Sequence, residues 1–182
     1  MEQTKEKAAL AYKTLKGTFG YKNPMQTPKL VKVIISSGVG KISDKARRKL
    51  IEDRLGRISG QKVAQRGAKK SVASFKLRQG DIVGYQVTLR GARMNDFLDK
   101  LIHIALPRTR DFRGIAIKAI DEMGNISIGL REHTIFPETS DEDVKDVFGL
   151  SITIVTTAKT KAESEAFLRQ IQFPLQAAAA TA

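Results

Sequence analysis

Three short segments alternate between apolar and polar residues, and this alternation constrains the fold more than any other feature of the chain. It is clearest over residues 82–90, with Val83, Tyr85, Val87 and Leu89 on one side and Gln86, Thr88 and Arg90 on the other. Residues 30–37 and 150–156 alternate in the same way. A period of two is that of a β-strand with one buried and one open face. Such half-polar strands are typical of antiparallel sheets.

Helical periodicity appears in several segments outside these strands. Apolar residues recur at spacings of three and four over about residues 5–19, 43–58 and 92–106, and Pro107 ends the third helix. A fourth helix, to about residue 171, begins with a predicted capping box of Thr160 and Glu163. A short strand at 61–65 and a hairpin over 115–120 and 126–130 complete the order. This order predicts an α+β fold, with helices packed on one face of a mostly antiparallel sheet and the other face open.

Length and composition limit the remaining possibilities. The 182 residues predict a single domain over residues 1–176, followed by an Ala-rich tail, 177–182, that we expect to be disordered. No run of eighteen apolar residues and no signal peptide is present, so we expect a cytoplasmic protein. With no cysteine, and only His103 and His133, the chain is poorly supplied for metal, cofactor or acid–base chemistry. We therefore expect neither an enzyme nor a cofactor.

Positive charge is concentrated in the first half of the chain. Residues 1–80 hold twenty Lys or Arg against five Asp or Glu, a net charge of +15, whereas residues 81–182 have a net charge of −2. Positive charges in such an excess repel one another unless a polyanion neutralises them. The charge distribution therefore favours nucleic acid as the partner. A membrane surface is the weaker alternative, because the basic residues fall mostly in predicted loops and short strands and not on an amphipathic helix.

Two groups of residues are candidates for contact with RNA. Residues 66–80 predict a basic loop or loose hairpin arm without an acidic residue, able to neutralise phosphates and to offer one aromatic ring. Its members are Arg66, Lys69, Lys70, Phe75, Lys76 and Arg78. The polar side of the sheet suits the wide, shallow minor groove of RNA, although an ordinary solvated face is the alternative. This side comprises Lys32, Ser36, Gln61, Gln86, Thr88 and Arg90.

A third group combines arginines with an acidic loop, and it predicts contact with a protein or a merely solvated loop. It comprises Arg108, Arg110 and Arg113 together with Glu138, Asp141, Glu142, Asp143 and Asp146. Residues 36–41 fail the Walker pattern, and the acidic loop lacks the ligand spacing of a Ca²⁺ site. A nucleotide-binding enzyme and a DNA-binding protein are the rival classes, but no motif gathers titratable groups and no helix-turn-helix or zinc module is visible.

Several motifs in sequence order resemble the bacterial family of large-subunit ribosomal protein five, over about residues 5–174. They are MQTPK (25–29), GVG (38–40), ISGQK (58–62), KKSVASFKLRQG (69–80), VTLRG (87–91), PRTRDFRG (107–114) and IFPE (135–138). The family usually has Asn-Met where this chain has Ser36-Ser37, which changes one expected RNA contact.

The resemblance implies a concave sheet that binds 5S rRNA in the central protuberance of the large subunit. The implied 5S contacts are Gln26, Lys29, Lys32, Ser36, Gln61, Arg66, Lys69, Lys70, Gln86, Thr88 and Arg90. The implied P-site tRNA contacts are Phe75, Lys76, Arg78 and Gln79. The third group, except Glu138, would form a bridge to a basic small-subunit protein. The 23S rRNA and other central-protuberance proteins would be further partners.

Overall fold

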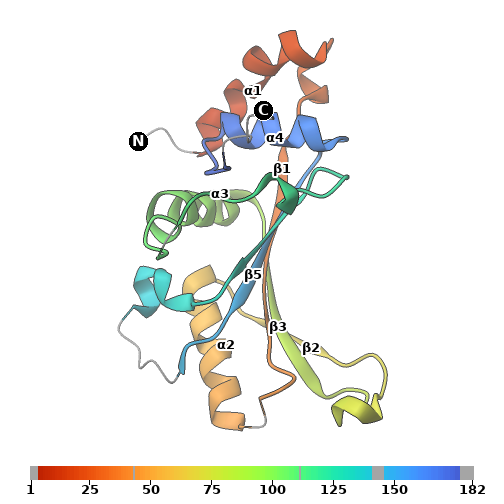
Figure 1. Cartoon of the computed structure of the whole chain (residues 1–182), viewed down its shortest axis with the longest axis vertical. Helices are drawn as coiled ribbons and strands as arrows, with labels where there is room; N and C mark the ends of the chain where they lie inside the picture. Colours follow the sequence, from red (N-terminus) through yellow and green to blue (C-terminus); the bar gives the residue numbers. More distant parts are fainter. Residues whose placement is uncertain (1–3, 43, 111, 141–145, 177–182) are drawn as a thin grey trace, which may run out of the picture. The chain divides into compact units, whose positions relative to one another are not determined.

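The computed structural model describes residues 4–42, 44–110, 112–140 and 146–176. Its four α-helices within these segments are α1 (Thr4–Phe19), α2 (Lys45–Ser59), α3 (Gly91–Lys100) and α4 (Lys161–Gln170). Its five strands are β1 (Leu30–Gly38), β2 (Ala64–Gly67), β3 (Ile82–Leu89), β4 (Ile126–Leu130) and β5 (Leu150–Thr156). They form one open antiparallel sheet in the order β2-β3-β1-β5-β4 (Figure 1). The predicted α+β class is confirmed.

The sheet has one buried and one partly open face, as the alternation predicts. Burial alternates along β3, where Tyr85, Val87 and Leu89 are buried and Gln86 and Thr88 are half-buried. The same alternation buries Val33 and Ile35 of β1, and Leu150, Ile152 and Ile154 of β5. The side chains between them are half-buried and include Lys32, Ser36, Ser151 and Thr153. The predicted parities are therefore confirmed.

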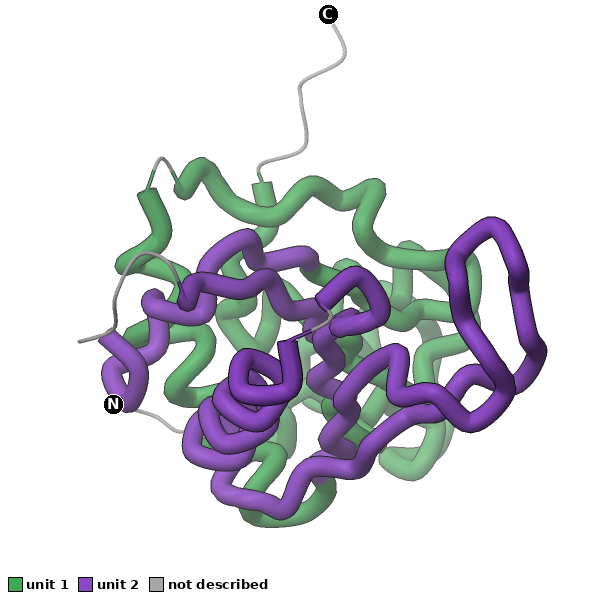
Figure 2. The backbone as a smooth tube through the Cα atoms, turned by 90° about the horizontal axis from the view of Figure 1, so that it is seen from below, with its two compact units in different colours: residues 1–33, 90–128, 153–182 green, residues 34–89, 129–152 purple. Residues whose placement is uncertain are grey.

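The chain divides into two compact units, shown in Figure 2. Unit 1 comprises residues 1–33, 90–128 and 153–182. Within it the structure describes residues 4–33, 90–110, 112–128 and 153–176. In this unit α1 packs against α3 and α4. The backbone N–H of Thr4 donates to the Asp99 carboxylate over 2.9 Å, and Lys7 Nζ donates to Gln172 Oε1 over 2.8 Å. These bonds fix α1 at its first turn and at its buried lysine.

A buried tyrosine ties the segment after α1 to the start of α4. The Tyr21 hydroxyl donates a short hydrogen bond to the Glu163 carboxylate. Burial, and then this hydrogen bond and the negative charge of Glu163, raise the pKa of Tyr21 well above its ordinary value. Glu163 also accepts the N–H of Lys159 over 2.7 Å, while Thr160 Oγ1 accepts the N–H of Glu163 over 3.3 Å. Only the Thr160 half of the predicted capping box is therefore present, because the carboxylate binds Lys159 and Tyr21 instead.

Unit 2 comprises residues 34–89 and 129–152, and α2 packs there against β3. Ile51, Leu55 and Ile58 are the apolar residues of α2 that are buried. The helix starts where Asp44 accepts the N–H of Ala46 over 2.9 Å, and it ends at Gly60, whose φ is 64°. Both ends thus carry the capping groups that stop a helix.

Three predicted elements differ in the structure. The hairpin over 115–130 is reduced to one bridge, Ile120 with Ile126, because residues 117–119 form a 3-10 turn. The third helix becomes π-helical over Leu101–Ala105, and the strand expected at 61–65 lies at 64–67. A single domain over residues 1–176 stays a prediction, and the tail, 177–182, lies outside the described residues.

Candidate nucleic-acid interface

The basic stretch forms a hairpin arm that continues β2 and β3 (Figure 1). Ala64 pairs with Gln86 and Arg66 with Gly84, and the pairing extends to Ala68, which exchanges backbone hydrogen bonds with Gly80 and Asp81 over 3.0 and 2.8 Å. A second bridge joins Val72 and Leu77 around the 3-10 turn Ala73–Phe75. Of the two predicted forms, a basic loop or a loose hairpin arm, the structure has the hairpin, and backbone pairing holds it in shape.

The arm presents its cations and its ring to solvent. Every charged side chain from residue 66 to residue 80 is exposed, and Phe75 is 72% exposed at the 3-10 turn. Lys76 follows with a left-handed backbone, φ 51°, which reverses the chain. Gln79 donates its backbone N–H to Ser71 Oγ over 2.9 Å, and this bond links the segments before and after the turn. The four residues predicted to contact tRNA thus lie together at and just after this turn.

In unit 2, Ser36, Arg66, Gln86 and Thr88 lie on the open face of the sheet, and Gln61, in the segment before β2, contacts the end of β3. We call these five residues the polar cluster. Arg66 Nε donates to Gln86 Oε1 over 2.6 Å, and its other N–H groups have no hydrogen-bond partner among the described residues. Gln61 Nε2 donates to the Thr88 carbonyl over 3.2 Å. No hydrogen bond to the Thr88 hydroxyl appears among the described residues. The cluster therefore offers donors and acceptors whose orientation is partly fixed.

Glycine at position 84 leaves this part of the open face without a side chain. By its strand parity Gly84 shares the face of Gln86 and Thr88. A Cβ atom there would lie 3.1 Å from the Ser37 carbonyl oxygen of the neighbouring strand. Ser37 itself is buried and donates its hydroxyl to the Gly149 carbonyl over 2.8 Å. Two serines depart from the family pattern. Ser36 lies on the open face, whereas Ser37 is buried and stabilises the fold through this hydrogen bond.

Beneath the cluster the buried face carries a tyrosine next to charged groups of α2. Burial, and then the negative charge of Glu52, raises the pKa of Tyr85, while the positive charge of Arg48 opposes the shift. Arg48 Nε donates to the Ile42 carbonyl over 2.6 Å. These groups support the strand from the α2 side and are not available to a ligand on the open face.

The remaining predicted 5S contacts belong to unit 1. Gln26 is exposed, and its Oε1 accepts the N–H of Lys22 over 2.9 Å within the cap of a 3-10 turn, Pro24–Gln26. Lys29 is exposed, and its Nζ lies 3.2 Å from Met25 Sδ. Lys32 is half-buried on β1, and Arg90 is exposed at the start of α3. All four side chains have solvent access.

The predicted bridge residues are divided between the two units. Arg108, Arg110 and Arg113 are exposed in unit 1, and Asp146 is half-buried in unit 2. Asp141, Glu142 and Asp143 lie outside the described residues. The structure therefore locates the arginines and one of the four acidic residues.

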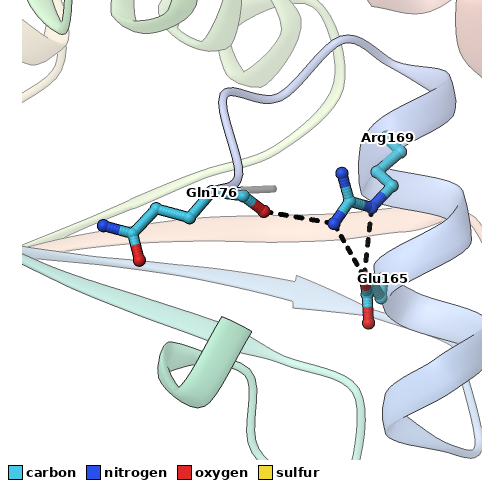
Figure 3. A network of polar contacts seen from close by, with 3 residues as sticks. All are labelled: Glu165, Arg169 and Gln176. Atoms are coloured by element: carbon cyan, nitrogen blue, oxygen red, sulfur yellow. Dashed lines mark hydrogen bonds and ion pairs between the residues drawn. The ribbon is translucent and has the colours of Figure 1, made fainter. Parts of the chain in front are cut away.

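Sequence reasoning missed the contacts that anchor the arginine segment. Ile115, which follows it, donates its N–H to Pro174 O over 2.8 Å and accepts the N–H of Gln176 over 2.9 Å. Arg169 Nη2 donates to the Gln176 carbonyl over 3.2 Å and to Glu165 over 2.9 Å (Figure 3). Only the i, i+4 spacing of Glu165 and Arg169 was a local signal, since the other partners lie far away in sequence.

Other kinds of site have little support in the described part of the chain. It contains no group of three or more His, Asp or Glu side chains placed to hold a metal ion. His133 is buried and stacks on Phe148 with 4.0 Å between ring centroids, so it is a core residue. None of the described helices combines the length and apolar character of a membrane span.

Two family descriptions together match most of the sequence. Residues 23–78 match the description "Ribosomal protein L5", and residues 82–175 match the description of the C-terminus of the same ribosomal protein family. A protein of Desulforapulum autotrophicum named large ribosomal subunit protein uL5 is 49% identical over 168 residues, 89% of this chain and 91% of the relative. The uL5 protein of Natranaerobius thermophilus is 47% identical over 163 residues, 88% and 90% of the two chains. The chain belongs to the ribosomal protein L5 family.

Membership in the L5 family confirms the resemblance and the expectation of a non-enzymatic, structural protein. The two matched regions of this L5 family member adjoin at residues 78 and 82, where the arm returns into β3. The rRNA-binding character of the family agrees with the charge distribution. The individual contacts assigned to each residue remain predictions.

Proposed function

We propose that this member of the L5 family is a structural component of the large subunit of the cytoplasmic ribosome and binds 5S rRNA through the polar cluster and the arm. The observation that carries the proposal is the open sheet face of unit 2, where oriented polar groups lie on the strand pair that continues into the basic arm. The names of the two relatives, both large-subunit proteins, support it.

The chemistry of the cluster suits the minor groove of an RNA helix. That groove is wide and shallow and displays 2′-hydroxyls, which can both donate and accept hydrogen bonds. The Thr88 hydroxyl and the oriented amides of Gln61 and Gln86 offer both, and Arg66 adds a cation. Because Gly84 has no side chain, a ribose edge would fit against the sheet there. We propose that the sheet is concave around this position. Lys69 and Lys70 would then neutralise flanking phosphates.

We predict that Thr88→Val weakens 5S rRNA binding while the fold is retained. The change is nearly isosteric, but it removes a hydroxyl that RNA would bury, leaving its partner unpaired at a cost of about 1–3 kcal/mol, or roughly 5- to 150-fold in affinity. Filter binding to purified 5S rRNA measures the effect. Thr88→Ser, which keeps the hydroxyl, is the matched control and should bind within a few-fold of wild type. Equal binding by the valine and serine variants would mean that the face is merely solvated.

Further contacts belong to the same proposal. Phe75 and the polar residues beside it would touch P-site tRNA, because the ring is exposed at the tip of a backbone-paired arm. Arg108, Arg110 and Arg113, with the acidic loop, would form a bridge to a basic small-subunit protein by complementary charge. The 23S rRNA and other central-protuberance proteins would be neighbours.

We predict that a photo-crosslinking amino acid at position 75 captures P-site tRNA, and one at position 110 captures a small-subunit protein, in intact ribosomes. Position 123 provides a control, because Met123 is 70% exposed in the Asp121–Asn125 turn and has no proposed partner. Mass spectrometry and primer extension identify the products. If position 110 captured only 5S rRNA, the assignment of the arginine segment to a protein partner would be wrong.

A further inference from the structure

Helix α4 ends at a residue with an uncommon backbone conformation. The N–H of Gln172 donates to the Arg169 carbonyl over 3.0 Å, and that of Phe173 donates to the Leu168 carbonyl over 2.9 Å. This pattern is a Schellman motif, in which glycine usually takes the left-handed position. Here Gln172 takes it, with φ 60°. An L residue is strained there, and such strain persists only where surrounding contacts hold it.

A buried lysine of α1 provides such a contact. Lys7 is 7% exposed, and its Nζ donates to Gln172 Oε1 over 2.8 Å. A buried amine needs a hydrogen-bond partner, and a glycine side chain at position 172 could not supply one. The side chain of Gln172 therefore fixes the point at which the chain leaves α4.

From this point the chain runs to the arginine segment, residues 108–114. We call residues 171–176 the strap. Ile115, directly after the arginine segment, donates its N–H to the Pro174 carbonyl over 2.8 Å, and its carbonyl accepts the N–H of Gln176 over 2.9 Å. These two bonds form an isolated parallel bridge between the strap and the end of the arginine segment.

Two further features keep the strap against the arginine segment. Arg169 Nη2 donates to the Gln176 carbonyl over 3.2 Å and to the Glu165 carboxylate over 2.9 Å (Figure 3). Gly114 has φ 89°, and a Cβ atom there would lie 3.1 Å from the backbone nitrogen of Gln176. The lack of a side chain at Gly114 therefore allows the two segments to approach closely.

The arginine segment has few backbone contacts of its own. Near its start, Thr109 donates its N–H to the Leu106 carbonyl over 3.1 Å. Residues 110 and 112–114 make no backbone–backbone hydrogen bond with another described residue. Arg110 and Arg113 are exposed in this stretch. Their placement therefore depends on the bond of Thr109 on one side and on the strap on the other.

We propose that the strap positions the arginine segment for its small-subunit protein partner, with Arg169 and Gln176 as positioning residues. Exposed arginines on a segment without backbone pairing would otherwise sample many conformations, and ordering them on binding would lower the affinity. The bridge to Ile115 provides that order before the partner binds. The inference rests on the proposed function in taking Arg110 and Arg113 as part of the bridge to the small subunit.

The experiment uses two substitutions that loosen the strap, each with a matched control in the full chain. Gln176→Pro removes the N–H that binds the Ile115 carbonyl, whereas Gln176→Ala keeps that N–H. Arg169→Met removes the donor to the Gln176 carbonyl. Glu165→Gln is its control, because Arg169 keeps its bond to the strap.

Hydrogen exchange followed by NMR measures local opening of the free protein at Ile115. We expect exchange there to be about three- to tenfold faster in Gln176→Pro and Arg169→Met than in their controls, the range for one lost hydrogen bond. The urea unfolding midpoint and the affinity for 5S rRNA should match those of the controls. Unchanged exchange at Ile115 in both test variants would overturn the inference.

Large subunits reconstituted with each variant are then titrated with small subunits, and joining is followed by light scattering. We expect both test variants to weaken joining by about two- to fivefold relative to their controls, the scale of exposed ion pairs. In a chain that carries Arg110→Gln and Arg113→Gln, the same changes should have no further effect, because the strap acts through these side chains.

A merely structural strap would give a different result. Normal joining despite faster exchange at Ile115, or effects that add fully to those of Arg110→Gln and Arg113→Gln, would overturn the positioning role. Failure of the proposed function is distinct, because the two arginine substitutions alone would then leave joining unchanged. That result would refute the bridge itself and this inference with it.

Discussion

Reversing the two adjacent lysines of the arm, with Lys69→Glu and Lys70→Glu, should lower the affinity for 5S rRNA by about 100-fold or more at low salt. Both side chains are exposed on an arm whose backbone is paired independently of them, so the fold should be retained. Under the proposed function, the change would remove two phosphate contacts and place two anions against the RNA backbone. Because phosphate contacts release counterions, wild-type affinity should itself fall steeply with salt, and the variant should show a shallower dependence.

Lys118→Glu with Lys159→Glu is the matched control for net charge. Both positions are exposed and lie outside the arm and the polar cluster. We expect this variant to stay within a few-fold of wild type in titrations from low to physiological salt. If both double variants lost affinity equally, binding would reflect total charge and not the arm. A nearly flat salt dependence of wild type would contradict phosphate neutralisation altogether.

Gly124→Ala should be the most destabilising of the single substitutions considered for this chain. Gly124 has φ 77°, and a Cβ atom there would lie 2.7 Å from Ala158 Cβ and 3.2 Å from Ser164 Cβ. The residue has little room to move, because its carbonyl accepts the hydroxyls of Thr156 over 2.7 Å and Ser164 over 2.6 Å. The left-handed backbone costs about 1–2 kcal/mol for an L residue and overpacking about 1–3 kcal/mol, so we expect about 2–5 kcal/mol.

Urea unfolding monitored by circular dichroism measures this loss of unfolding free energy. Gly17→Ala is the control, since no atom lies within 4 Å of its added Cβ. An alanine in a helix should raise the unfolding free energy by about 0.5–1 kcal/mol relative to glycine. A loss below about 1 kcal/mol in Gly124→Ala would show that α4 and the turn can separate without cost. The folded fraction of Gly124→Ala should bind 5S rRNA normally, because Gly124 lies outside the polar cluster and the arm.

The sequence alone predicted those features that depend on local periodicity. Alternation along β3 placed Gln86 and Thr88 on the face opposite Tyr85 and Val87, and the structure has the same parity. Residues 66–80 lacked both periodicity and acid, and they form the exposed arm. Charge and side-chain period are properties of neighbouring residues, so a single sequence contains them.

The tertiary structure decided which partners the polar groups take. Local spacing predicted that Glu163 would cap α4, but its carboxylate binds the hydroxyl of Tyr21, 142 residues away. The predicted hairpin over 115–120 and 126–130 keeps only the bridge of Ile120 with Ile126, and Ile115 pairs with the distant Leu175 instead. A hydrogen bond between residues far apart leaves no periodic trace in either segment, since it depends on how the chain packs.

The sequence by itself determined the class of this protein: its α+β order, its half-polar strands, its basic first half and the motifs of the L5 family. The tertiary structure alone decided how the candidate site is arranged. In the structure Arg66 donates a hydrogen bond to Gln86, and Gln61 donates one to the Thr88 carbonyl. Ser37 is buried, whereas Ser36 lies on the open face. The physical reason is that composition and period fix which residues can face solvent, whereas hydrogen-bond partners depend on distances that packing alone sets.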